Sequence, residues 1–127
     1  MLHFKFAILA AIGGALGSAA RYLTGAAAVI AFGANFPWGT MIVNVVGSFL
    51  MGFLTGLAVY RSAIGPDLRV FLTTGILGGY TTFSAFALDT SFLAGRQLSL
   101  AAGYVLGSLV LSIAALYLGI ALSKLGL

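Results

Sequence analysis

Long apolar stretches dominate the chain, and polar or charged residues divide them into four segments, at about residues 4–30, 38–60, 69–94 and 98–123. Each segment is close to the ~20 residues that an α-helix needs to cross ~30 Å of hydrocarbon. The connections are short, and Gly65-Pro66-Asp67 is a strong turn signal between the second and third segments. The pattern predicts an all-α membrane protein with four transmembrane helices, in one domain that covers residues 1–127.

The first segment also has features of a secretory signal. Lys5 precedes its apolar run, and Gly17-Ser18-Ala19-Ala20 is similar to a small-residue cleavage region. Cleavage there would leave three apolar segments that still need a membrane. The membrane prediction therefore holds in both cases, and only the number of helices depends on this choice.

Glycines recur four positions apart within every segment. Membrane helices associate by close backbone approach, which pairs of small residues permit. Tight bundling of the helices, without a further role, explains most of these glycines. The pairs are Gly13 with Gly17, Gly52 with Gly56, Gly75 with Gly79, and Gly103 with Gly107.

The middle of the third segment carries the polar run Gly78-Gly79-Tyr80-Thr81-Thr82-Phe83-Ser84. Adjacent glycines and β-branched threonines are poor helix formers, so we expect the third helix to be broken at mid-membrane. Irregular backbone at that depth needs protein, water or an ion to satisfy its carbonyl oxygens, which suit a hard cation. Phe83 and Phe86 follow on one helix face. Their ring edges could face an anion, although this spacing is also typical of core packing.

Two further segments carry lines of polar side chains at a spacing of four residues, which places each line on one helix face. Either line could serve interhelical hydrogen bonds, which are worth on the order of 0.6 kcal/mol each in membranes. Together with the break in the third segment, they favour a hydrated path. The lines are Thr40, Asn44 and Ser48 in the second segment, and Tyr104, Ser108 and Ser112 in the fourth.

Composition excludes several functional classes. The chain is 61% hydrophobic and 6% charged, whereas soluble domains have roughly 25% charged residues. It contains no cysteine, which excludes disulfides, thiolate metal sites and cysteine nucleophiles. His3 is the only histidine, and no acid, base and nucleophile stand together, so we do not expect an enzyme. The net charge of +4 comes from scattered residues that form no nucleic-acid patch.

Four spans place both termini on one side of the membrane. Lys5, Arg61, Arg69 and Lys124 would lie on that side, against Arg96 and Arg21 on the other. This weak bias permits insertion in both orientations, and so permits an antiparallel dimer.

Two charged residues lie inside apolar segments. Arg21 either anchors its helix at the far interface or faces a water-filled vestibule. Asp89 follows Phe86 by one helical turn, and we expect it to lie at the interface and to cap a helix or pair with a basic residue.

The chain resembles the Fluc, or CrcB-like, family of fluoride channels along its whole length. The most specific part is Gly75-Ile76-Leu77-Gly78-Gly79-Tyr80-Thr81-Thr82-Phe83-Ser84-Ala85-Phe86. Gly39-Thr40-Met41-Ile42-Val43-Asn44 and Arg21-Tyr22 support the resemblance.

This resemblance implies passive export of cytoplasmic fluoride by a dual-topology antiparallel homodimer in the bacterial inner membrane. Such a dimer has two pores and a central structural sodium ion. The resemblance implies that the carbonyl oxygens of Gly78 and Thr81 hold the sodium ion, and that Arg21 attracts anions into a vestibule.

The resemblance also implies a set of pore residues. The ring edges of Phe83 and Phe86 would face fluoride, and Asn44 would line the pore. Hydroxyl groups would come from Thr40, Thr82, Ser84, Tyr104, Ser108 and Ser112. Two positions depart from the family, which commonly has threonine or serine at Ala85 and glutamate at Asp89.

Two other functions remain open at this stage. A small dual-topology exporter of drugs or cations has a similar length and four helices, but it needs a carboxylate inside the membrane. The first three segments have none away from their ends. A non-transporting membrane assembly subunit would need only the glycine pairs.

Overall fold

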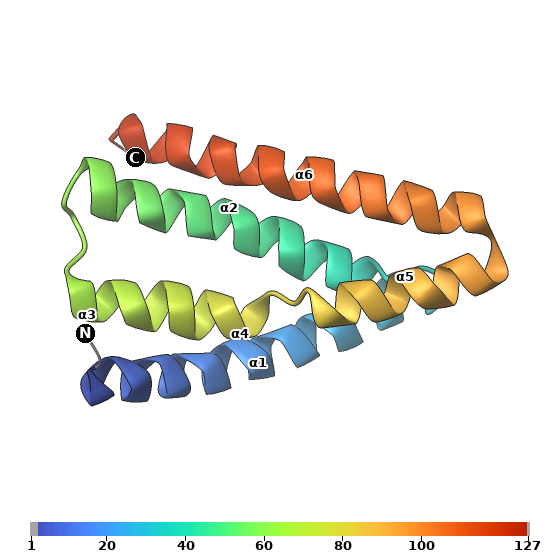
Figure 1. Ribbon diagram of the computed structural model, residues 1–127, viewed down its shortest axis with the longest axis horizontal. Coiled ribbons are helices and arrows are strands. Elements are labelled where there is room, and N and C mark those ends of the chain that lie inside the picture. Colours follow the sequence, from blue (N-terminus) through green and yellow to red (C-terminus); the bar gives the residue numbers. More distant parts are fainter. Residues whose placement is uncertain (1–2, 127) are drawn as a thin grey trace.

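The computed structural model describes residues 3–126, and these residues are helical almost throughout (Figure 1). Four helices in this range are long and apolar enough to cross a membrane, which confirms the predicted number of spans. Residues 1, 2 and 127 of the predicted domain lie outside the described range. The helices are α1 (Phe4–Phe32), α2 (Trp38–Tyr60), α3 (Pro66–Arg69), the π-helix η1 (Val70–Leu77), α4 (Gly78–Tyr80), α5 (Ser84–Arg96) and α6 (Leu98–Lys124).

The third span, Pro66–Arg96, is assembled from α3, η1, α4 and α5. Figure 1 shows the long helices running back and forth, with both ends of the described chain at the same end of the bundle as the connection from α2 to α3. α2 packs along α6, and α1 packs along η1 and α4. The break between α4 and α5 lies about midway along the length of the bundle (Figure 1).

Glycines form the two close helix contacts. A Cβ atom on Gly13 would lie 2.6 Å from the carbonyl oxygen of Phe71, and one on Gly79 would meet the backbone of Gly14. Between α2 and α6, Gly52 lies against the backbone of Leu116, and Gly119 lies against the backbone of Phe49. These contacts are the close backbone approach that small residues permit.

The fourth predicted glycine pair was wrong. A Cβ atom on Gly103 would meet nothing within 4 Å, and one on Gly107 would make only ordinary contact with Met41. Gly119 makes the close contact of α6 instead. Spacing alone does not tell which face of a helix meets a neighbour.

Alanine at Gly13 should therefore destabilise the bundle, by about 1–3 kcal/mol, because its methyl group overlaps the backbone of η1. The matched control is Gly103→Ala, which adds the same methyl group in open space and should be neutral or stabilising by about 0.5–1 kcal/mol. Thermal unfolding in detergent, followed by circular dichroism, measures both. Equal midpoints for the two variants would contradict this packing.

The break in the third span is shorter than predicted and lies later in the chain. Gly78 and Gly79 are helical in α4, and Thr81 turns extended, with φ −86° and ψ 160°. α5 resumes at Ser84, so the irregular stretch is residues 81–83. The two glycines remain helical because Gly79 packs against Gly14 of α1. The irregular stretch is stabilised by the side chain of Asn44 on α2.

The segment before the break is an eight-residue π-helix, which we did not predict. Long π-helices are rare, and short ones occur frequently at functional sites. Thr73 Oγ1 donates to the carbonyl oxygen of Arg69 at 2.7 Å, and Thr81 Oγ1 donates to that of Leu77 at 2.9 Å. These hydroxyls add hydrogen bonds inside and directly after the wide turns of the helix.

Candidate functional site

Asn44 on α2 takes the place of the missing helical hydrogen bonds in the break. Its Oδ1 accepts a hydrogen bond from the backbone N of Thr82 at 2.8 Å, and its Nδ2 donates to the carbonyl oxygen of Thr82 at 3.0 Å. An unpaired backbone group in an apolar interior costs several kcal/mol. This asparagine therefore stabilises the non-helical backbone at Thr82. The second N–H of its amide group remains available for another acceptor.

Helix α1 holds the other side of the break. Arg21 Nε donates to the carbonyl oxygen of Gly79 at 3.1 Å, and Thr24 Oγ1 lies 3.0 Å from the hydroxyl of Tyr80. Arg21 is thus half-buried beside the break and does not reach the far end of the bundle. Neither Thr24 nor Tyr80 was predicted from sequence to have a role in the site, although Thr24 follows Arg21 by three residues and so shares its helix face.

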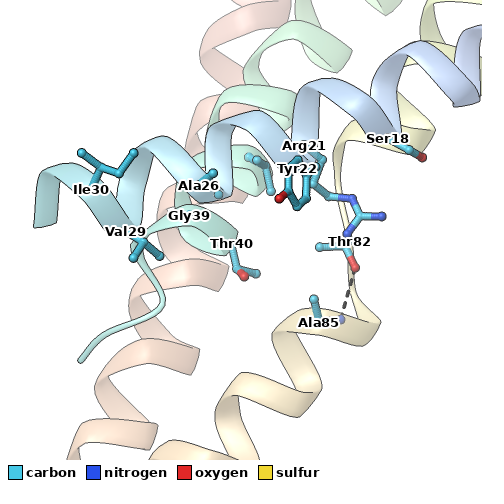
Figure 2. Close-up of a pocket in the computed structure, with 12 residues that line it drawn as sticks. Ser18, Arg21, Tyr22, Ala26, Val29, Ile30, Gly39, Thr40, Thr82 and Ala85 are labelled. Carbon is cyan, nitrogen blue, oxygen red and sulfur yellow. Dashed lines mark hydrogen bonds between the residues drawn. The ribbon is translucent and has the colours of Figure 1, made fainter. Parts of the chain in front are cut away.

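A cavity of about 690 Å³ opens between α1, the start of α2 and the break. Figure 2 shows the Arg21 guanidinium group projecting toward Thr82, with Thr40 across the cavity. The Thr82 hydroxyl accepts a hydrogen bond from the backbone N of Ala85 at 3.2 Å. The cavity thus has one cationic side chain, Arg21, and four side chains with hydroxyls among its lining residues, namely Ser18, Tyr22, Thr40 and Thr82.

A second hollow, of about 190 Å³, lies on the other side of the break, between α5 and α6. Its lining contains six of the predicted pore residues and three other residues, namely Thr81, Leu109 and Ile113. Thr82 lines both hollows, so it forms a wall common to the two. The lining is Asn44, Thr81, Thr82, Phe83, Phe86, Ser108, Leu109, Ser112 and Ile113.

Two phenyl rings and a buried hydroxyl line this hollow. The ring centroids of Phe83 and Phe86 lie 5.7 Å apart, with an angle of 52° between the ring planes. Phe86 is buried, at 9% exposure, whereas Phe83 is 77% exposed. Ser108 is buried, and its Oγ has no hydrogen-bond partner among the described residues. A buried hydroxyl without a partner favours a polar guest.

Tyr104 lies one turn before Ser108, and it is among the most buried side chains in the described range. Its ring packs on Phe86 and on Phe36, with centroids 5.2 and 5.4 Å apart. Its hydroxyl donates to Asp89 Oδ2 at 3.1 Å. The expectation that Asp89 caps a helix or pairs with a base was therefore wrong, because Tyr104 faces it across α5 and α6.

Of the other predicted residues, Ser84 and Gly78 line neither hollow, whereas Thr81 lines the second one. Ser84 is exposed, and its hydroxyl lies 3.4 Å from that of Thr82. Within residues 3–126, no hydrogen bond across the break reaches the carbonyl oxygens of Gly78 and Thr81. The same range contains no cluster of three histidine, cysteine or acidic side chains that could hold a metal.

Fold and site together define a multi-pass membrane protein with a broken third span, in which hydroxyl, amide and guanidinium donors and two phenyl rings border the break. The model of the family described as CrcB-like protein, Camphor Resistance (CrcB), matches residues 8–120. The chain belongs to this CrcB-like family, as its sequence predicted.

Curated relatives cover nearly all of the chain. A protein of Agrobacterium fabrum is 52% identical over 117 residues, which are 91% of this chain and 94% of the relative. A protein of Nitrobacter winogradskyi is 48% identical over 94% of this chain and 95% of its own length. One from Rhizobium meliloti is 48% identical over 92% and 94%. Each relative is named fluoride-specific ion channel FluC.

Proposed function

We propose that this protein is a fluoride-specific ion channel that lets cytoplasmic fluoride leave the cell passively across the bacterial inner membrane. The observation that carries the proposal is the near-full-length identity of about half to relatives named fluoride-specific ion channels. The hollow beside the break supports it, because it combines donors with aromatic rings. It contains no ionised side chain that would hold an anion permanently.

Fluoride is small and strongly hydrated, so a selective path must replace its water with donors and still release it. Arg21 attracts the anion to the larger cavity, and the hydroxyls of Thr40 and Thr82 offer the first donors. The free N–H of Asn44 and the hydroxyls of Ser108 and Ser112 continue the path past the break. The positive edges of Phe83 and Phe86 complete the shell. The ring of Tyr104 packs against Phe86, and the Tyr104 hydroxyl donates a hydrogen bond to Asp89.

A second copy of the chain in antiparallel orientation completes this path in our proposal. Phe83 lines the hollow and is largely exposed in a single chain. A second copy would bury this phenyl ring. The carbonyl oxygens of Gly78 and Thr81 fit a hard cation, because no donor of the described residues reaches them. Two chains would offer four such oxygens to a structural sodium ion. When bound, that ion joins the two breaks.

The antiparallel arrangement requires insertion in both orientations. Because Arg21 lies beside the break, the described residues leave Lys5, Arg61, Arg69 and Lys124 at one end against Arg96 at the other. The positive-inside rule favours one orientation with this distribution, so the measured orientation of the chain tests the antiparallel arrangement directly.

Orientation can be measured cleanly because the chain has no cysteine. With Ser62→Cys in the exposed α2–α3 connection, a membrane-impermeant maleimide should label about half of the copies from each side of an inner-membrane vesicle. The matched control is Gln97→Cys, at the opposite end of the bundle, which should give the same division. Labelling of the two positions from opposite single sides would contradict the antiparallel homodimer.

Fluoride sensitivity of cells separates the proposal from its rivals. A bacterial strain without its own fluoride exporter should grow in millimolar fluoride when it expresses this protein. A small drug or cation exporter would protect against cationic dyes instead, and an assembly subunit would protect against neither. Protection against dyes alone would refute the fluoride proposal.

A further inference from the structure

A shallow notch of about 430 Å³ lies at the end of the bundle where α2 and α6 finish, far along both helices from the break. Tyr60, Arg61 and Lys124 line it. All three side chains are exposed. None of them takes part in the fluoride path proposed above.

Each cation of the notch contacts a residue at the end of the other helix. Lys124 Nζ, at the end of α6, lies 4.2 Å from the ring centroid of Tyr60, the last residue of α2. The Arg61 guanidinium group, directly after α2, lies beside Gly126, where a Cβ atom would be 3.2 Å from Arg61 Nη1. Gly126 has a φ of +84° and leaves room for this group. Both positive charges therefore line one hollow.

The backbone that carries Arg61 is held in an unusual conformation. Ser62 has a φ of +50°, and it is the only residue other than glycine with positive φ in the described range. The turn is closed by Ala63, whose backbone N donates to the carbonyl oxygen of Leu57 at 3.0 Å. Residues with a Cβ atom rarely adopt this region, and such residues concentrate at functional sites.

The charge of the notch is not neutralised by the described residues. The chain has two acidic residues against six basic ones. Asp67 pairs with Lys5 at 3.1 Å, and Asp89 accepts from Tyr104. The C-terminal dipoles of α2 and α6 offer only about half a negative charge each. Within residues 3–126, two full cations therefore exceed the negative charge at this end of the two helices by about one unit.

We propose that this notch binds the phosphate of an anionic phospholipid headgroup. Arg61 and Lys124 supply charge-assisted donors, and the Tyr60 hydroxyl supplies a third donor. Aromatic and basic residues at the ends of membrane spans lie at headgroup depth, and basic pockets between such spans bind lipid headgroups. The exposed apolar side chains of Val59 and Leu125 adjoin the notch in sequence and suit acyl chains. A soluble phosphate would not use these apolar neighbours.

Native mass spectrometry of the purified full chain, titrated with phosphatidylglycerol, tests this proposal. Arg61→Gln combined with Lys124→Gln should weaken binding of the first lipid, by about fivefold for each charge removed. The matched control is Lys5→Gln combined with Arg69→Gln, which removes the same charge at the same end outside the notch. It should change binding of the first lipid by less than about twofold. The charge-retaining exchange of Arg61→Lys with Lys124→Arg should keep most of the binding, since guanidinium and ammonium groups both donate charge-assisted hydrogen bonds to phosphate.

Equal losses in the two neutralised double variants would overturn the proposal, because they would indicate a general charge effect. Equal binding of phosphatidylcholine would do the same, since that headgroup carries no net charge. Inorganic phosphate at millimolar concentration should not displace the lipid, and complete displacement would indicate a soluble phosphate site instead. If the double variant does not purify folded, Arg61→Gln and Lys124→Gln are compared singly with Arg69→Gln. Fluoride flux is not a readout here, so this test and that of the channel fail independently.

Discussion

Asn44→Leu should destabilise the protein by about 2 kcal/mol or more, because it leaves the N–H and carbonyl of Thr82 without partners in an apolar surrounding. The same change should reduce fluoride flux at least about tenfold, since Thr82 is the wall common to both hollows. Thermal unfolding in detergent and fluoride efflux from liposomes measure the two effects.

Ser48→Ala is the matched control for Asn44. Ser48 lies one turn further along the same face of α2, and it lines neither hollow. This change should leave both stability and flux nearly unchanged. Asn44→Asp gives a finer test, because an ionised carboxylate can still accept from the Thr82 N–H but cannot donate to its carbonyl oxygen. If Asn44→Leu behaved like Ser48→Ala, the account of the break would be wrong.

Phe83→Leu should lower fluoride flux by about twofold to tenfold while leaving the fold of a single chain intact. The side chain is 77% exposed, so little packing is lost within the chain. Leucine has no positive ring edge, and the loss of an aromatic contact worth about 0.5–1.5 kcal/mol at the barrier corresponds to a factor of up to about ten in rate. Fluoride efflux, measured with an electrode, checks this expectation.

Phe4→Leu is the matched control for Phe83→Leu. Phe4 is 76% exposed, and it lies at the start of α1, outside both hollows. The same substitution at the same exposure should therefore leave flux unchanged. Equal flux in the two variants would remove Phe83 from the path, whereas equal losses would indicate a general effect of exposed phenyl rings.

The four spans could be predicted from sequence because bilayer thickness sets the length of an apolar helix. The second span matches the predicted limits, and the third extends further at both ends, to Pro66 and Arg96. The existence of a break was also predictable, since Thr81 and Thr82 form helices poorly. The hollow brings together Asn44, Phe83, Phe86, Ser108 and Ser112, which the sequence had singled out. Their role in fluoride passage stays a prediction.

Features that depend on neighbouring helices could not be predicted. Gly78 and Gly79 stay helical because α1 approaches closely there, and a local pattern does not contain that contact. The same reason explains why Gly103 makes no close contact. Nothing in Val70–Leu77 distinguishes a π-helix from an α-helix. The hydrogen bond from Tyr104 to Asp89 joins residues on two helices whose rotation was unknown.

Fluoride selectivity of the purified protein is the most direct test of the central claim. The chain is reconstituted into liposomes loaded with potassium fluoride or potassium chloride, and efflux is started with a potassium ionophore so that only passive anion movement is recorded. We expect rapid fluoride efflux and chloride efflux no faster than in protein-free liposomes. Absent fluoride efflux, or chloride efflux at an equal rate, would contradict the account.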